Sequence, residues 1–201
     1  MNRGEVIENS GFASLFDGLK GMHSVLDDAF KQQFNRSLPF ADELLDRWER
    51  AKNLNFGDGS SVYDSSYVFG EVKVGRNTWI GPFTIIDGSG GLSIGSNCTI
   101  SSGVHIYTHD NVAQTLTGGE APIEREPVSI GDRTYIGPNV VIKRGISIGD
   151  QCIIGAGSFV NHDVPSHSVA AGTPAKIIGK TSVQNNQLSV EYFPKHNPES
   201  L

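Results

Sequence analysis

The feature of this sequence that most constrains its fold is an aliphatic residue at every sixth position through the middle of the chain. The frame slips by two residues in the Gly-rich segment 87–91, and it is interrupted between Ile106 and Ile130. A period of six matches neither an α-helix nor an alternating strand. The residues in this frame are Val62, Val68, Val74, Ile80, Ile86, Ile94, Ile100, Ile106, Ile130, Ile136, Ile142, Ile148, Ile154 and Val160.

The other positions of each hexad fit the same repeat. Gly directly follows the aliphatic residue at Gly75, Gly81, Gly95, Gly131, Gly137, Gly149 and Gly155. Small or β-branched residues stand four positions after it, at Thr78, Thr84, Cys98, Val104, Thr134, Val140, Ile146, Cys152, Ser158 and Val164. We therefore predict one short strand and one turn per hexad, with three hexads closing a triangular coil of about 18 residues. About five such coils would stack into an all-β solenoid, with Gly allowing positive φ or close backbone approach at the corners. A Gly-rich β-sandwich is the alternative fold, but its turns do not recur in sixes.

The segment before the repeat has a different texture. Residues 1–56 place apolar side chains such as Leu44 and Trp48 at helical spacing. This pattern predicts a short N-terminal helical extension with two helices, at about 20–35 and 39–52.

The repeat itself predicts a domain over residues 57–180. A long segment, 107–127, breaks the repeat and should project from one corner as an extruded loop. Loops longer than about 12–15 residues are usually functional or disordered. The polar residues 181–201 predict a loosely attached C-terminal tail.

Composition excludes several classes of protein. The net charge of −6 gives no reason to expect a nucleic-acid partner, because phosphate backbones need clustered Lys and Arg. The sequence has no run of about 20 apolar residues, and its first ten residues do not resemble a signal peptide. Cys98 and Cys152 lack the paired spacing of a metal site, so we expect reduced, buried thiols. These features predict a cytoplasmic protein without a membrane span.

Three segments resemble the hexapeptide-repeat acyltransferases, in the branch of galactoside, maltose and polysaccharide O-acetyltransferases. They are ISSGVHIYTHD at 100–110, VSIGDRTYIGPNVVIKRGISIGDQCII at 128–154 and AAGTPAKII at 170–178, the most specific of the three. The resemblance covers about residues 60–180. It implies a left-handed parallel β-helix, a homotrimer and the use of acetyl-CoA as donor. The resemblance alone supplies the handedness and the trimer, since the left-handed sense runs against the usual crossover rule.

His109, at the mouth of the loop, matches the position of the family's catalytic histidine. Histidine is suited to take the proton of an attacking hydroxyl. The alternative interpretation is that His109 is an ordinary histidine of a surface loop. His105 is the other candidate for the catalytic histidine, but it should point outward from a regular hexad. Asp87, roughly one coil earlier, could orient His109, although an aspartate before Gly also commonly caps a turn.

The resemblance also implies candidate contacts to the coenzyme arm, which would lie along a coil edge. They are Tyr135, Gly137, Gly155, Ala156, Thr173 and Lys176. Lys176 could meet a coenzyme phosphate, or it could be an ordinary solvated lysine.

The expected activity is transfer of an acetyl group from acetyl-CoA to a hydroxyl of a sugar or polysaccharide precursor, with no acyl-enzyme and no metal. N-acetylation of an amino sugar and acetylation of a xenobiotic alcohol remain alternatives, because the repeat does not identify the acceptor. A zinc enzyme resembling γ-type carbonic anhydrases would need three histidine ligands, of which His105 and His109 could supply two. A non-catalytic scaffold is the remaining alternative.

Overall fold

The computed structural model describes residues 3–194 and divides into two compact units, one ending at Asp46 and one beginning at Arg47. The first unit contains α1 (Arg3–Glu8), α2 (Ala13–Phe34) and α3 (Phe40–Leu44). The helix predicted at 20–35 thus begins earlier, at Ala13, and ends where Asn35 adopts a left-handed conformation with φ 52°.

The helix predicted at 39–52 is in fact two helices. The backbone is extended at Leu45, with φ −106° and ψ 117°, so α3 ends there and α4 (Arg47–Asn53) begins separately. Leu44 and Trp48 therefore do not share one helix face, and both side chains are exposed.

α4 belongs with the second unit and closes the first coil. The Arg50 guanidinium donates hydrogen bonds to the carbonyl oxygens of Tyr63 and Ser66. Ala51 and Phe56 are buried in the same apolar core as the repeat. The second unit therefore starts before the boundary predicted at residue 57, because the last helix covers the open end of the solenoid core.

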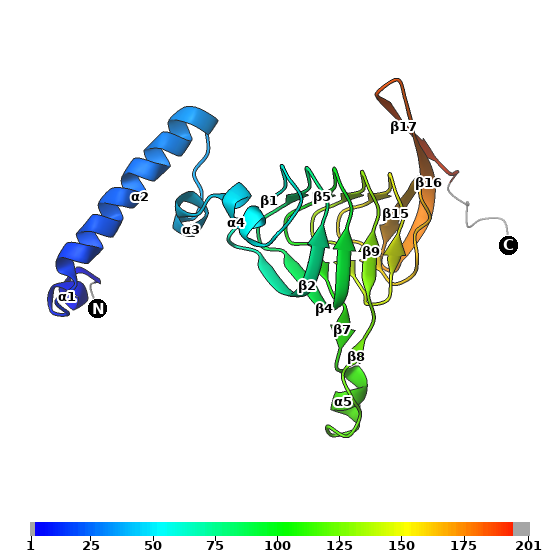
Figure 1. Cartoon of the computed structure of the whole chain (residues 1–201), viewed down its shortest axis with the longest axis horizontal. Helices are drawn as coiled ribbons and strands as arrows, with labels where there is room; N and C mark the ends of the chain where they lie inside the picture. Colours follow the sequence, from blue (N-terminus) through cyan, green and yellow to red (C-terminus); the bar gives the residue numbers. More distant parts are fainter. Residues whose placement is uncertain (1–2, 195–201) are drawn as a thin grey trace. The chain divides into compact units, whose positions relative to one another are not determined.

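The second unit is a parallel β-helix whose short strands stack on three faces, as seen side by side in Figure 1. The first face holds β1 (Ser61–Val62), β3 (Trp79–Ile80), β5 (Thr99–Ile100), β10 (Tyr135–Ile136), β13 (Ile153–Ile154) and β15 (Ser168–Gly172). These six parallel strands mark six levels, one more than the repeat predicted. The predicted class, a left-handed parallel β-helix, is confirmed.

Two long strands bend around a corner and contribute to both remaining faces. They are β2 (Tyr67–Val74) and β4 (Ile85–Ile94), which pair with a register shift between Gly70 and Val72. The second face continues with β6 (His105–Ile106), β11 (Val141–Ile142) and β14 (Phe159–Val160). The third face continues with β9 (Val128–Ile130) and β12 (Ser147–Ile148).

The predicted inward frame forms the core. All of its aliphatic residues are buried except Val68, which is partly buried against the core. Ile80, Ile100, Ile136 and Ile154 stack in register along the first face, each fully removed from solvent. Burial of one such side chain is worth roughly 1.5–3 kcal/mol, so the row is a main source of stability.

The corner glycines have a narrower role than the sequence suggested. None of the seven glycines that follow the aliphatic residue has positive φ. A Cβ at Gly131 would lie 2.7 Å from the backbone of Gly149, so glycine is required there by the close stacking of coils. The left-handed conformation falls instead on the residue two positions later, such as Asn97 with φ 58° and Asn139 with φ 56°.

The C-terminal segment is more ordered than the predicted loose tail. β16 (Ala175–Gln184) and β17 (Gln187–Tyr192) form an antiparallel hairpin attached to β15. The rest of the predicted tail, from residue 195, lies outside the described residues. Within residues 3–194, no helix is long and apolar enough to cross a membrane.

Candidate active site

The central feature of the candidate site is a direct contact between His109 and Asp87. The sequence slip places Asp87 in the bend of β4, and His109 begins the short strand β7 (His109–Asp110) one coil later. The His109 Nδ1 atom lies 2.7 Å from Asp87 Oδ2. The Asp87 side chain is 1% exposed and that of His109 is 38% exposed, so the histidine can reach a ligand while its partner cannot.

Asp87 is held ionised by its surroundings. Burial by itself raises the pKa of this carboxyl. Hydrogen bonds from Ser89, Thr108 and His109 outweigh the burial and hold the pKa well below its usual range. A carboxylate beside Nδ1 favours the tautomer that carries its proton on Nδ1, which leaves Nε2 free to accept one.

Thr108 is a site residue that the sequence analysis missed. Its N–H donates to Asp87 Oδ2 at 2.8 Å, and its hydroxyl donates to the Asp87 carbonyl oxygen at 2.9 Å. The hydroxyl also accepts the N–H of Gly90 at 2.8 Å. Thr108 therefore ties the bend of β4 to the start of the loop. Its position beside His109 was the only available signal.

His105 occupies a different environment. It lies on β6, in the second face, with its Cα opposite those of Ile85 and Val141. Its Nδ1 atom lies 3.3 Å from the hydroxyl of Tyr107, and no carboxylate contact is recorded for it among the described residues. Within residues 3–194, no three His, Cys, Asp or Glu side chains gather in a metal-binding arrangement.

The extruded loop is a structured arm. β7 pairs antiparallel with β8 (Glu124–Arg125), and α5 (Val112–Leu116) lies at the outer end, which projects from the stack in Figure 1. At the base, the Glu126 N–H donates to the Thr108 carbonyl oxygen at 3.0 Å. Arg144, which the sequence analysis did not assign to the site, contacts Asp110, Glu124 and Glu126.

The structure divides the candidate coenzyme residues between two places. Gly137 stacks on Ala156 at one corner of the coils. At the same corner, the Thr173 hydroxyl donates to the carbonyl oxygen of Gly157 at 3.2 Å. Gly155 also stacks against Ala171, whose partner across the β15–β16 pair is the exposed Lys176.

Tyr135 lies elsewhere, on the first face. It lines an apolar hollow of about 400 Å³ beneath the hairpin, with Val183 and Leu188 on the opposite side. The N–H groups of Gly137 and Gly155 donate to the next coil, to the carbonyl oxygens of Ile154 and Ala170. These two N–H groups are therefore not free to bind a ligand. A ligand at this corner would have to contact other polar groups there.

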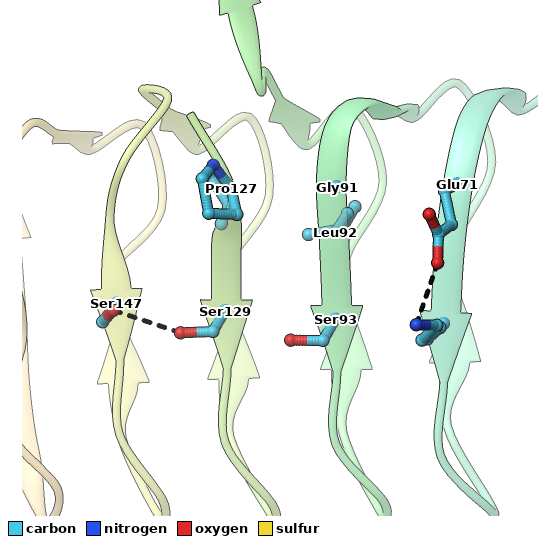
Figure 2. Close-up of a pocket in the computed structure, with 9 residues that line it drawn as sticks. Glu71, Gly91, Leu92, Ser93, Pro127, Ser129 and Ser147 are labelled. Atoms are coloured by element: carbon cyan, nitrogen blue, oxygen red, sulfur yellow. Dashed lines mark hydrogen bonds and ion pairs between the residues drawn. The ribbon is translucent and has the colours of Figure 1, made fainter. Parts of the chain in front are cut away.

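A second hollow, of about 260 Å³, opens on the third face beside the base of the loop. Figure 2 shows Ser93, Ser129 and Ser147 on neighbouring strands, with Gly91 and Pro127 nearer the loop end. Ser129 and Ser147 are joined by a 3.1 Å hydrogen bond. Glu71 and Lys73, which form a 2.8 Å ion pair, also line this hollow.

Comparison with known proteins identifies the family to which this fold belongs. A family described as hexapeptide repeat of succinyl-transferase matches residues 71–108 and 127–162. Galactoside O-acetyltransferase of Escherichia coli K12 is 31% identical over 149 residues, covering 63% of this chain and 71% of the relative. The chain belongs to the hexapeptide-repeat acyltransferases. The two stretches matched by the family lie on either side of the extruded loop.

Two solved structures place this acyltransferase in the O-acetyltransferase branch. Galactoside acetyltransferase in complex with coenzyme A is 28% identical, with a TM-score of 0.56, covering 81% of this chain and 82% of that one. A maltose O-acetyltransferase from Clostridium difficile 630 is 26% identical, with a TM-score of 0.53, covering 87% and 90%. The chain is an acetyltransferase.

Proposed function

We propose that this acetyltransferase moves an acetyl group from acetyl-CoA to a hydroxyl of a sugar or polysaccharide precursor, with His109 as general base. The observation that carries the proposal is the 2.7 Å contact between His109 and the buried, ionised Asp87 at the mouth of the loop. A half-exposed imidazole oriented by a buried carboxylate is suited to proton transfer with a bound substrate.

The proposed reaction is a direct transfer. His109 Nε2 takes the proton of the acceptor hydroxyl while the hydroxyl oxygen attacks the thioester carbonyl carbon. The tetrahedral intermediate collapses by breaking the carbon–sulfur bond, and the imidazolium returns the proton to the departing thiolate. Asp87 accepts the hydrogen bond from Nδ1 throughout and stabilises the imidazolium.

The two thiols are unsuited to forming an acyl-enzyme. Cys98 and Cys152 are buried inside the coils. Burial raises the pKa of both thiols, which disfavours the nucleophilic thiolate. This placement supports attack by the acceptor itself.

We assign the donor to the corner that contains Gly137, Gly155, Ala156 and Thr173, with Lys176 nearby for a phosphate. The coenzyme A bound by the galactoside acetyltransferase supports acetyl-CoA as donor. Tyr135 lies on the neighbouring face and would contact a different part of the coenzyme. The sugar acceptor is proposed from the galactoside and maltose enzymes among the relatives. A homotrimer is proposed from the family, because the projecting arm could then contribute to a neighbouring subunit's site.

The test of this proposal is the replacement of His109 by Ala, with His105→Ala as the matched control. Turnover is measured at saturating acetyl-CoA, with a methyl galactoside and maltose as acceptors. His109→Ala should lower turnover by roughly 10²–10⁴-fold, the usual range for a general base. His105→Ala should cost far less, and both variants should still bind coenzyme A. An inactive His105→Ala beside a nearly normal His109→Ala would show that the assignment of the base is wrong.

A further inference from the structure

We propose that Arg144 is a positioning residue for the reaction, which clamps both strands of the extruded arm to the β-helix and so fixes His109 against Asp87. The inference deepens the proposed function and rests on it, because it concerns how the general base is held. The clamp is defined as Arg144 with Asp110, Glu124 and Glu126.

The guanidinium of Arg144 uses all three of its nitrogens in the clamp. Nε donates to Asp110 Oδ2 at 2.5 Å, Nη1 to Glu126 Oε1 and Nη2 to Glu124 Oε2. The side chain is only 12% exposed. A planar group with donors in a fixed fork suits this arrangement, and a lysine ammonium does not reproduce it.

The partners of Arg144 lie on both sides of the arm's base. Asp110 follows His109 directly on β7, whereas Glu124 lies on β8 and Glu126 follows that strand. Arg144 itself lies in the turn after β11, which belongs to a regular coil. The Arg144 side chain thus joins the β-helix to both strands of the arm. One of the groups that it holds is Asp110, the residue directly after the proposed general base His109.

The local backbone makes room for the clamp. Gly145 has φ +76°, and a Cβ there would lie 2.1 Å from Glu126 Oε2. Any other residue at this position would strain the turn and push the Glu126 carboxylate away. On the far side, Asp110 Oδ1 accepts the N–H of Val112 at 3.2 Å, which continues the support toward α5.

The clamp also has an electrostatic consequence for His109. Arg144 partly neutralises the three carboxylates of the clamp, which lie close to the strand that carries His109. Its hydrogen bond to Asp110 lowers the pKa of that carboxyl. The charged groups around β7 are Asp87 from β4, Asp110 from β7, Glu124, Arg125 and Glu126 from the returning strand, and Lys143 and Arg144 from the turn after β11. Removal of the Arg144 charge leaves a more negative environment, which favours the protonated imidazole.

The experiment compares Arg144→Gln, Arg144→Lys and Lys143→Gln. Lys143→Gln is the matched control, because it removes one positive charge from the same turn and its exposed side chain is outside the clamp. Each variant is assayed for kcat and kcat/KM between pH 5.5 and 9 with the acceptors named above. Hydrogen exchange of the amides in 109–126 is measured on the same proteins.

Arg144→Gln should lower kcat about tenfold or more, because small misplacements of reacting groups are costly. The acid limb of its kcat/KM profile should move to higher pH, because the variant lacks a positive charge close to the strand that carries His109. Arg144→Lys should keep the acid limb of the wild-type kcat/KM profile, because it retains the positive charge. Its kcat should still be lower than that of the wild type, because the ammonium lacks the fixed donors of the guanidinium. In Arg144→Gln the arm's amides should exchange faster while those of 128–142 do not change, and Lys143→Gln should exchange as the wild type does.

The outcomes separate this proposal from the proposed function. If His109→Ala is inactive but Arg144→Gln keeps its kcat and its arm exchange, the clamp is refuted and the general base stands. A fully active Arg144→Lys would also refute the role of the fork. If the wild type transfers acetyl to none of the acceptors, the proposed function fails, and unchanged exchange in Arg144→Gln would refute the clamp independently.

Discussion

Replacement of Asp87 by Asn tests the physical basis of the candidate site. The carboxylate accepts the Ser89 N–H on Oδ1 at 2.9 Å, and the Thr108 N–H and His109 Nδ1 on Oδ2 at 2.8 and 2.7 Å. An amide has only one accepting oxygen. If the amide oxygen faces Thr108 and His109, the NH2 group faces the Ser89 N–H, and two donors point at each other. In the flipped orientation, the NH2 group instead faces the two donors of Thr108 and His109.

Asp87→Asn therefore leaves at least one backbone donor without its acceptor. That donor is the N–H of the buried Thr108 in one orientation of the amide and the N–H of the more exposed Ser89 in the other. The loss costs up to about 1–3 kcal/mol. For a chain of this size, the melting temperature should fall by roughly 2–12 °C at pH 7. Turnover should fall by about 10²-fold or more, because the neutral amide no longer stabilises the imidazolium and in one orientation reverses the tautomer of His109.

The stability effect should depend on pH in a defined direction. The pKa of Asp87 in the fold is below its usual range, so its contribution is present above the unfolded pKa of about 3.9. The contribution is lost as the pH falls through the lower folded value. The difference in melting temperature between wild type and Asp87→Asn should be full at pH 6–7 and should narrow below about pH 4.

The control for this variant is Asp132→Asn. Asp132 also accepts a backbone N–H, from Ser96 at 2.7 Å, but it is exposed and lies outside the candidate site. It should change stability slightly and leave turnover intact. The reasoning is refuted if Asp87→Asn folds and retains turnover within about threefold of the wild type.

Two further predictions concern assembly and the donor. Light scattering should give about three times the monomer mass of 21.6 kDa, and a value near one monomer would contradict the trimer. Coenzyme A at a hundredfold excess over its Kd should stabilise the native state by about 2.7 kcal/mol. A melting temperature that stays constant up to millimolar coenzyme A would count against the assigned donor.

The core of the β-helix could be predicted because its repeat acts on every coil. A side chain at each sixth position must return to the interior, so Ile100, Ile136 and Ile154 fall in register without any knowledge of the turns. The period contains no information on handedness, since the same inward frame fits either sense of coiling. That property came from resemblance to the family.

The elements outside the repeat were harder to predict, for local reasons. The division between α3 and α4 depends on the extended backbone at Leu45, which helical spacing does not reveal. The terminal hairpin did leave a signal. Asn185 and Asn186 have φ of 50° and 61°, the conformation that asparagine tolerates in tight hairpin turns, and Leu188 and Val190 alternate after them. The polar composition of the whole tail obscured that pattern.

The contact between His109 and Asp87 could be predicted because both belong to departures from the repeat at the same corner. The clamp could not, because Arg144 lies in an ordinary hexad and is 18–34 positions from its partners in the chain. No spacing rule connects residues of a projecting arm to the coil beneath it. Only the antiparallel pairing of β7 with β8 brings Asp110 and Glu124 together.

The parallel register explains how a repetitive scaffold brings the residues of the candidate site together at this corner. Ile86 of β4 is paired with Ile106 of β6, so the chain leaves the second face at the same position along the strand in both coils. In one coil the next residue is Asp87, and in the other the chain continues through Thr108 into the arm. The ladder that fixes the buried isoleucines therefore also brings the carboxylate to Thr108 and His109. The same ladder continues through β11 and β14, so the corner that carries the candidate site is held by the pairing of successive coils.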